Sequence, residues 1–430
     1  EVKKEGVATG EYFLLPAGQT TAPLTIEGHM DQNAGNEYQN LTIDGIGITV
    51  VATQYTYESD SYGKTYDEKA DATIQVNKDN IQDYLDGKYG PIDGMTLVLA
   101  EGEYGRIELG RATAYAGSNT KYYLGGIESN PDAIKQDIAN HLHGGAGKRE
   151  YVRSMSNVTL KAADGAAVTI NGLVAFGGQV NSNKWYSKDF VANRDMSETV
   201  NNNISYWVVQ NWSNITFEGI TFTKAVDIVN SLEKTNIDGV SFKNCKFNIN
   251  NITETETEYY GIRFYSDFNN GQLKNLVVDN CEFNGCRLAV YTHHVYNISV
   301  TNSKFDTTGH NAIAIQDSKG ACDHGNVVIT GNTFRDIGDR IIRFNNVGEG
   351  TTITISNNTS VNSGDGDGEI IKATTLPEGM EVTMTNNNWG KVGDKDPVIG
   401  NGFIETTTGG TIVIITPTED TPKTEPEKNP

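Results

Sequence analysis

The sequence predicts an all-β solenoid, namely a right-handed parallel β-helix with an N-terminal capping helix. Two observations support this prediction: a short phrase that recurs along the chain, and a further strand-like segment that follows most of its copies. Recurrence every 22 to 36 residues is typical of stacked repeats. The copies are NITFEGITF (214–222), GVSFKNCKF (239–247), NLVVDNCEF (275–283), ISVTNSKF (298–305), VVITGNTF (327–334), TITISNNTS (352–360) and EVTMTNNNW (381–389).

Each copy has the character of two short strands around a sharp turn. Val, Ile, Thr and Phe alternate with polar residues, and Asn or Gly stands where the turn needs a left-handed backbone. Alignment on the last residue gives a column predicted to stack inside: Phe222, Phe247, Phe283, Phe305, Phe334, Ser360 and Trp389. The column two residues earlier is Ile220, Cys245, Cys281, Ser303, Asn332, Asn358 and Asn387, whose three Asn residues we expect to form an internal amide ladder.

A third strand completes each coil. It is visible as GIRFYS (261–266), LAVYTH (288–293), NAIAIQ (311–316), RIIRFN (340–345) and EIIKAT (369–374). Alternation points the Ile and Phe side chains inward. One outward column is then Asp227, Arg263, Ala289, Ala314, Arg343 and Lys372. The next is Val229, Tyr265, Tyr291, Gln316, Asn345 and Thr374, with His293 just beyond.

Three short strands per coil with stacked aromatic residues resemble the pectate-lyase-like superfamily of right-handed parallel β-helices, over about residues 73–415. The resemblance extends to the start of the coils. NIQDYLDG (80–87) predicts a short helix with Asn80 as N-cap and Gly87 as its end, and TLVLAEGEY (96–104) follows. Such a helix would cover the open apolar end of the first coil.

The chain divides into three parts by composition. Residues 1–72 are predicted to be an N-terminal β extension and linker, 73–415 the β-helix, and 416–430 a disordered tail rich in Pro, Thr, Glu and Lys. Insertions at 111–152 and 178–206 interrupt the coils, and the first includes a predicted helix from Asp132 to Leu142. The insertions could wall a groove for sugars or pack onto the coils.

The charge balance argues against some partners. The formal net charge is −21 without any basic run, so nucleic acid and anionic membranes are not expected partners. No apolar run is long enough to cross a membrane. Cys245 and Cys281 share a column and predict a buried thiol stack, whereas Cys286 and Cys322 lie in loops and could pair or stay free. None of the four has the close Cys spacing typical of zinc sites.

The loop entering the third strand carries a column of its own. TTGH (307–310), DIGD (336–339), NSGD (362–365) and KVGD (391–394) each place His310, Asp339, Asp365 or Asp394 directly after Gly, with Asp367 and Glu369 nearby. Each Asp could bond to the backbone of its own turn. Alternatively, clustered carboxylates predict a Ca²⁺ site, with Asp339, Asp365, Asp367 and Asp394 as ligands.

The resemblance implies roles for the outward residues. In calcium-dependent members of the superfamily, calcium neutralises a substrate uronate and an Arg or Lys removes the C5 proton. By analogy, Arg343 or Lys372 would be the base and Arg340 would steady the sugar carboxylate. The residues that would bind substrate are Arg263, Tyr265, Tyr291, His293, Gln316, Asn345 and His310. The chain lacks an exact lyase signature and the acid-pair motif of the polygalacturonase-like hydrolases. A further pair, Asp323 and His324, is expected in a solvated loop.

Two functions therefore remain open. One is an extracellular enzyme on polysaccharide, a lyase acting on an acidic glycan; the other is a non-catalytic bacterial surface adhesin or glycan-binding module. Either would be a monomer. Either would be secreted or attached to the cell wall, because the tail resembles wall-spanning spacers.

Overall fold

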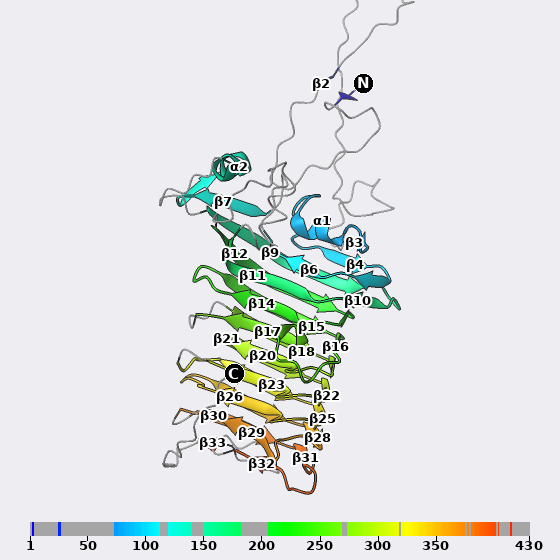
Figure 1. The fold of residues 1–430 in the computed structure, drawn as a ribbon, viewed down its shortest axis with the longest axis vertical. Coiled ribbons are helices and arrows are strands. Elements are labelled where there is room, and N and C mark those ends of the chain that lie inside the picture. Colours follow the sequence, from blue (N-terminus) through cyan, green and yellow to red (C-terminus); the bar gives the residue numbers. More distant parts are fainter. Residues whose placement is uncertain are drawn as a thin grey trace, which may run out of the picture.

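Three parallel β-sheets run along the molecule, and each coil of the chain contributes one strand to each sheet (Figure 1). The computed structural model describes residues 2–3, 25–26, 73–111, 119–139, 149–181, 205–268, 273–317, 320–374, 376–377, 380–400, 403 and 413–414. Within these residues the predicted parallel β-helix is confirmed, because strands that are one coil apart pair in parallel and in register.

The sheets are named here in the order in which the chain visits them. Sheet 1 contains β3 (Thr73–Val76), β4 (Thr96–Leu99), β9 (Arg149–Ala162), β12 (Ser205–Glu218), β15 (Asn236–Lys243), β18 (Leu273–Asp279), β21 (Val295–Thr301), β24 (Asn326–Thr330), β27 (Thr352–Ser356), β30 (Glu381–Thr385) and β33 (Val413–Ile414). Sheet 2 contains β5 (Gly102–Tyr104), β10 (Val168–Ile170), β13 (Thr221–Phe222), β16 (Lys246–Asn248), β19 (Glu282–Asn284), β22 (Lys304–Thr308), β25 (Thr333–Ile337), β28 (Thr359–Val361) and β31 (Asn388–Trp389). Sheet 3 contains β6 (Ile107–Leu109), β11 (Leu173–Asn181), β14 (Val226–Asn230), β17 (Ile262–Ser266), β20 (Val290–His293), β23 (Ile313–Gln316), β26 (Ile342–Asn345), β29 (Glu369–Ala373) and β32 (Val398–Ile399).

A single left-handed residue makes the turn from sheet 1 to sheet 2. Asn244, Asn280 and Asn302 have φ of 54°, 52° and 52°. Asn357 and Asn386 follow with 55° and 56°. Asn tolerates this conformation better than other residues with a Cβ, so the recurring Asn of the phrase is explained by the turn.

The predicted aromatic stack lies in the interior. The ring centroids of Phe247 and Phe283 are 4.5 Å apart, those of Phe283 and Phe305 are 4.8 Å apart, and those of Phe305 and Phe334 are 5.0 Å apart. All four side chains are buried. The stack runs through the core because the rings come from in-register strands of sheet 2.

The predicted amide ladder is also confirmed. The Asn332 side-chain amide donates to Asn358 Oδ1 at 3.1 Å, and that of Asn358 donates to Asn387 Oδ1 at 2.9 Å. Each Nδ2 also donates to a main-chain carbonyl of sheet 1, which for Asn358 is that of Ile329 at 2.9 Å. The buried amides are therefore satisfied by one another and by the backbone.

The first coil is covered by α1 (Ile81–Asp86), as predicted (Figure 1). The helix ends at Gly87, whose φ is 81°. Gln82 uses its side-chain amide as a strand would use its backbone: Nε2 donates to the Glu108 carbonyl at 2.9 Å, and Oε1 accepts from the Glu108 amide at 3.1 Å. The open edge of β6 is thereby paired without a further strand.

The insertions are described only in part. In the first, β7 (Thr120–Leu124) and β8 (Ile127–Ser129) form a hairpin, and β7 also pairs antiparallel with β9. The predicted helix from Asp132 to Leu142 is α2 (Pro131–Ala139), and residues 140–148 lie outside the described residues. In the second, β11 and β12 pair antiparallel at their outer ends, and 182–204 are not described.

Of the predicted N-terminal extension, the structure describes only β1 (Val2–Lys3) and β2 (Thr25–Ile26), an antiparallel pair. The linker and the predicted tail at 416–430 lie outside the described residues. All four cysteines are free and buried. The loop thiols Cys286 and Cys322 are therefore not paired.

The internal ladder gives a stability prediction. Asn358→Ala removes an acceptor and a donor, so the Asn332 main-chain amide loses its acceptor and the Asn332 side-chain amide keeps only the Val300 carbonyl. We expect the free energy of unfolding to fall by about 1–3 kcal/mol, the range for an unsatisfied buried polar group. Denaturant unfolding measures this change. Asn388→Ala, an exposed position on the neighbouring strand, is the matched control, and equal losses in both variants would contradict the ladder's role.

Candidate functional site

The outer face of sheet 3 carries two columns of side chains, in a register that differs at one strand from the sequence-based prediction. Arg263 pairs with Tyr291 rather than Ala289, and Tyr265 pairs with His293 rather than Tyr291. The predicted side chains do point outward, but Val290 and not Leu288 pairs with Ile262, so the strand is displaced by two residues along its neighbour. Alternation assigns the face of each side chain but not the register between coils, because a shift of two residues keeps every side chain on its face. From Ala314 onward the predicted columns are correct: Ala314, Arg343 and Lys372 are paired neighbours.

The N-terminal part of this face is aromatic. The Tyr265 and His293 rings stack at 4.4 Å, and Tyr265 and Tyr291 are nearly parallel at 6.4 Å. Arg263 lies 5.1 Å from the Tyr265 ring centroid, and its Nε is 3.4 Å from Asp227 Oδ1. Burial raises the pKa of Tyr291 to about 12, so its hydroxyl remains a neutral donor and acceptor at neutral pH.

His293 does not lie where the substrate-binding prediction needs it. Its side chain is buried, with 1% exposure, and Nδ1 is 2.6 Å from the Ser266 carbonyl oxygen. His293 is therefore covered in this structure, and its predicted contact with a substrate stays a prediction. Gln316 and Asn345 are half-buried in the same column, and Asn345 accepts a hydrogen bond from the Thr374 hydroxyl.

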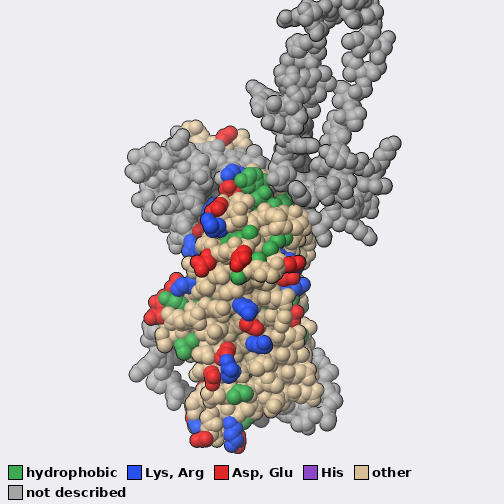
Figure 2. Space-filling model, turned by 90° about the vertical axis from the view of Figure 1, so that its right-hand side faces the viewer, with side chains coloured by type: hydrophobic (Ala, Val, Ile, Leu, Met, Phe, Trp, Pro, Cys, Tyr) green, Lys and Arg blue, Asp and Glu red, His purple; other side chains and the backbone are tan. Residues whose placement is uncertain are grey.

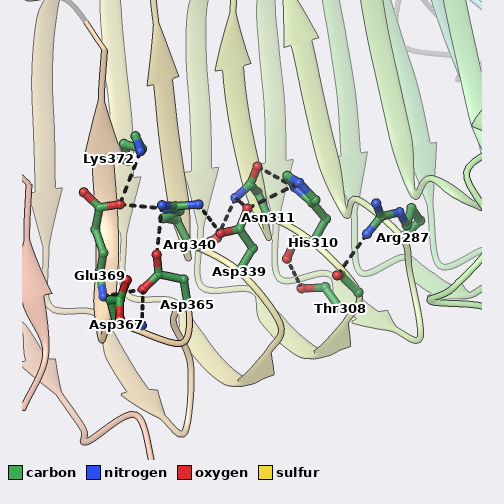
Figure 3. Close-up of polar contacts among 11 residues, drawn as sticks. Arg287, Thr308, His310, Asn311, Asp339, Arg340, Asp365, Asp367, Glu369 and Lys372 are labelled. Atoms are coloured by element: carbon green, nitrogen blue, oxygen red, sulfur yellow. Dashed lines mark hydrogen bonds and ion pairs between the residues drawn. The ribbon is translucent and has the colours of Figure 1, made fainter. Parts of the chain in front are cut away.

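An ion-pair hub lies beside the C-terminal part of the face, centred on Arg340 (Figure 3). Its Nη1 is 2.5 Å from Asp339 Oδ1, and its Nη2 is 2.8 Å from Asp365 Oδ2. Its Nε is 2.7 Å from Glu369 Oε2. Burial by itself lowers the pKa of Arg340, but the hydrogen bond to Glu369 and the charges of Asp339 and Asp365 outweigh burial and raise it. Arg340 is thus a fixed cation held by three carboxylates.

The hub continues into the preceding coil through two polar side chains. Asn311 Nδ2 donates to Asp339 Oδ2 at 3.1 Å and to the Arg340 carbonyl at 3.2 Å. His310 Nε2 lies 3.3 Å from Asp339 Oδ2, and its Nδ1 lies 2.8 Å from Asn311 Oδ1. Burial lowers the pKa of His310 more than Asp339 raises it, so the ring is neutral at neutral pH.

The predicted convergence of four aspartates on one point is not found. Within the described part of the chain, Asp339, Asp365, Asp367 and Asp394 do not bring three ligand oxygens within 4.8 Å of one another. Asp365 Oδ1 instead accepts the Asp367 and Glu369 amides, both at 2.9 Å, which is the local-turn alternative. Asp367 is 96% exposed beside Lys395, and Asp394 is exposed. Stacked carboxylates need a cation between them, and Arg340 supplies it; Ca²⁺ binding by this protein stays a prediction.

Arg343 differs from Arg340 in having no counter-charge. It lies on the outer face of sheet 3, half-buried, and pairs in register with Lys372 of the next coil. Among the described residues it makes no ion pair, and its buried Nε has no hydrogen-bond partner. Lys372 Nζ is 3.7 Å from Glu369 Oε2, a contact that the carboxylate shares with Arg340. Two adjacent cations are therefore only partly neutralised.

Sequence reasoning selected many members of this site but missed others. Arg343 and Lys372 were found from alternation along two neighbouring third strands, and Arg340 was assigned by the resemblance. Glu369 was placed beside the predicted calcium ligands and not with Arg340, and Asn311 was assigned no role. Their partners depend on the register between coils, which the sequence did not settle.

The face of the coils formed by sheet 2 has a different charge pattern. Figure 2 shows the side nearest sheet 2, where basic and acidic side chains are interspersed. Lys246 and Lys304 flank Glu282 at 3.3 and 3.5 Å, and Arg335 pairs with Asp306. These exposed pairs contribute little to stability, and they provide a control surface for the site.

Removal of the central guanidinium tests the hub. In Arg340→Gln, three carboxylates face one another with one neutral amide among them, so we expect stability at neutral pH to fall by on the order of 1–3 kcal/mol. Added salt should recover part of the loss, because it screens carboxylate repulsion. Urea unfolding at low and high ionic strength measures both effects. Arg335→Gln, in the exposed pair with Asp306, should change little; a similar loss there would count against the hub.

The fold and the site together define a parallel β-helix with a polar, partly cationic outer face on sheet 3. No family model matches the chain, and no curated protein matches it. Among solved structures, the chain is similar to a hyperthermoactive exopolygalacturonase from Thermotoga maritima, with 13% identity over 74% of this chain and 92% of that chain, and a TM-score of 0.27. A TM-score this low does not establish a shared fold, so the parallel β-helix is assigned from the strand pairing alone. No helix in the described ranges is long and apolar enough to cross a membrane.

Proposed function

We propose that this protein binds an acidic polysaccharide against the outer face of sheet 3. The observation that carries the proposal is Arg343, a half-buried guanidinium without a counter-charge among the described residues, next to Lys372. A buried donor without a partner is unfavourable unless a ligand supplies the acceptor. A sugar carboxylate matches the fork of an arginine and can accept two hydrogen bonds from it.

The rest of the face suits a linear polymer. Successive coils repeat every ~4.8 Å, so a chain lying along the column meets Lys372, Arg343, Ala314 and Tyr291 in turn, with Asn345 and Gln316 in the adjacent column. Amide, hydroxyl and guanidinium groups are the donors and acceptors that sugars use. A polysaccharide target places the protein outside the cell in this proposal, secreted or attached to a wall.

Binding measurements with matched variants test the proposal. Titration with polygalacturonate, alginate and neutral dextran should give binding to an acidic polymer and none to dextran. Arg343→Ala should weaken acidic binding by roughly tenfold to a hundredfold, the equivalent of losing a hydrogen bond between charged groups. Arg335→Ala removes an equal charge from sheet 2 and should leave affinity unchanged. Equal losses in both variants, or no acidic polymer bound, would rule the proposal out.

A second candidate is an elimination reaction on the same polymer. The observation that favours it is the adjacency of Arg343 and Lys372 on the outer face, because one side chain can hold the sugar carboxylate while the other acts as the general base. Arg340 cannot be that base, since three carboxylates hold it charged. Ca²⁺ belongs to this candidate as the ion that would neutralise the substrate carboxylate.

The lyase candidate has a direct assay. Elimination creates an unsaturated uronate, so ultraviolet absorbance should rise during incubation with an acidic polymer, and EDTA should stop the rise. Lys372→Met and Arg343→Ala should each abolish it while circular dichroism shows the fold intact. Binding without any rise in absorbance would leave the non-catalytic function, a glycan-binding module or adhesin.

A further inference from the structure

A second polar cluster lies away from the Arg340 hub, where the chain passes from sheet 3 to sheet 1. Asp317 directly follows β23, and Cys322 and His324 precede β24. All three are buried, with exposures of 0%, 4% and 0%. Their ligand atoms, a carboxylate oxygen, a thiol sulfur and an imidazole nitrogen, lie within 4.8 Å of one another.

Hydrogen bonding fixes the tautomer of His324. Its Nδ1 is 2.7 Å from the Val295 carbonyl oxygen, which can only accept, so Nδ1 carries the hydrogen. In the neutral ring Nε2 then presents a lone pair. That Nε2 lies 2.8 Å from Asp317 Oδ2, and neither atom has a hydrogen-bond partner although both are buried. Two acceptors at this distance repel unless a cation lies between or beside them.

Neighbouring groups hold the carboxylate in place. Asp317 Oδ1 accepts the main-chain amide of His294 at 2.9 Å and lies 3.4 Å from His294 Nε2. The His294 Nδ1 in turn lies 3.1 Å from the Ser266 carbonyl oxygen. Metal-binding side chains in proteins are usually oriented in this way, with the second imidazole nitrogen or carboxylate oxygen bonded to the protein.

We propose that Asp317, Cys322 and His324 bind one divalent transition-metal ion, for which Zn²⁺ is the best match, in a buried site between sheets 3 and 1. Zn²⁺ takes sulfur, nitrogen and oxygen ligands at about 2.0–2.3 Å, and a thiolate in the set selects against Ca²⁺ and Mg²⁺. On binding, the Cys322 thiol proton leaves to solvent and the sulfur lone pair bonds to the metal. His324 contributes its Nε2 lone pair without losing a proton.

The charge of the cluster also suits a metal. Asp317 Oδ2 is buried and has no hydrogen-bond partner among the described residues. A divalent ion would balance both the carboxylate and the new thiolate.

The sequence had argued against such a site, because no cysteine has a close Cys partner and His324 was expected in a solvated loop. Both expectations were based on linear spacing. In the structure His324 is fully buried, and Asp317, Cys322 and His324 bring three ligand types together.

Cobalt substitution tests the site in the full chain. After chelator treatment and removal of the chelator, Co²⁺ should bind with one equivalent per chain and give a thiolate-to-cobalt charge-transfer band, and Zn²⁺ should displace it. Cys322→Ser should lose the band, and His324→Gln should weaken Co²⁺ binding at least about tenfold. Cys286→Ser, another buried free thiol that belongs to no ligand group among the described residues, should keep the band and the affinity.

Stability provides the second measurement. Zn²⁺ should raise the melting temperature of the unsubstituted protein and of Cys286→Ser but not of Cys322→Ser, because only a ligand of the folded state stabilises it. The proposal is overturned if the unsubstituted protein binds no Co²⁺ or shows no thiolate band, a result that needs no variant to fold. It is equally overturned if Cys322→Ser retains the band, or if Zn²⁺ leaves the melting temperature unchanged. A proton shared by His324 and Asp317 would produce the first of these outcomes.

Discussion

The structure depends on in-register stacking of parallel coils. Each side chain has the same position of the previous and the next coil as its nearest neighbours, about 4.8 Å away. A column tolerates a residue type only if that residue can pack on a copy of itself or if another group pairs with it between the copies. Phenylalanine packs on its copies by ring stacking. Asparagine finds its partner because each side-chain amide donates a hydrogen bond to the amide oxygen of the Asn in the next coil.

Charged residues cannot repeat in this way, and the structure shows how their repulsion is removed. Asp339 and Asp365 occupy one column of neighbouring coils, and Arg340 lies between them and Glu369. The guanidinium has enough donors for three carboxylates in one plane. The same acidic column that predicted a calcium site is therefore held by a cation that the chain itself supplies.

Two of the places that depart from this rule bear on function. Arg343 and Lys372 bring like charges together with little compensation, and His324 turns a lone pair toward Asp317. Incomplete pairing of polar groups at these two places suits a ligand from outside the chain. The first location faces solvent and suits a polymer, whereas the second is buried and suits an ion.

The sequence by itself determined the fold and much of the site's composition. Local conformational preference and like-with-like stacking need no knowledge of distant residues. They explain the period of the phrase, the Asn at the turn, and the Phe and Asn columns. Arg343 and Lys372 were located in the same way. The tertiary structure decided which partner each polar group takes. The register between β17 and β20 differs by two residues from the predicted one, so Tyr291 and His293 lie one column away from their predicted places, and His293 is buried. Asp317, Cys322 and His324 come together only in three dimensions, because the positions of residues outside the strands depend on what they pack against and not on the periodicity of the strands.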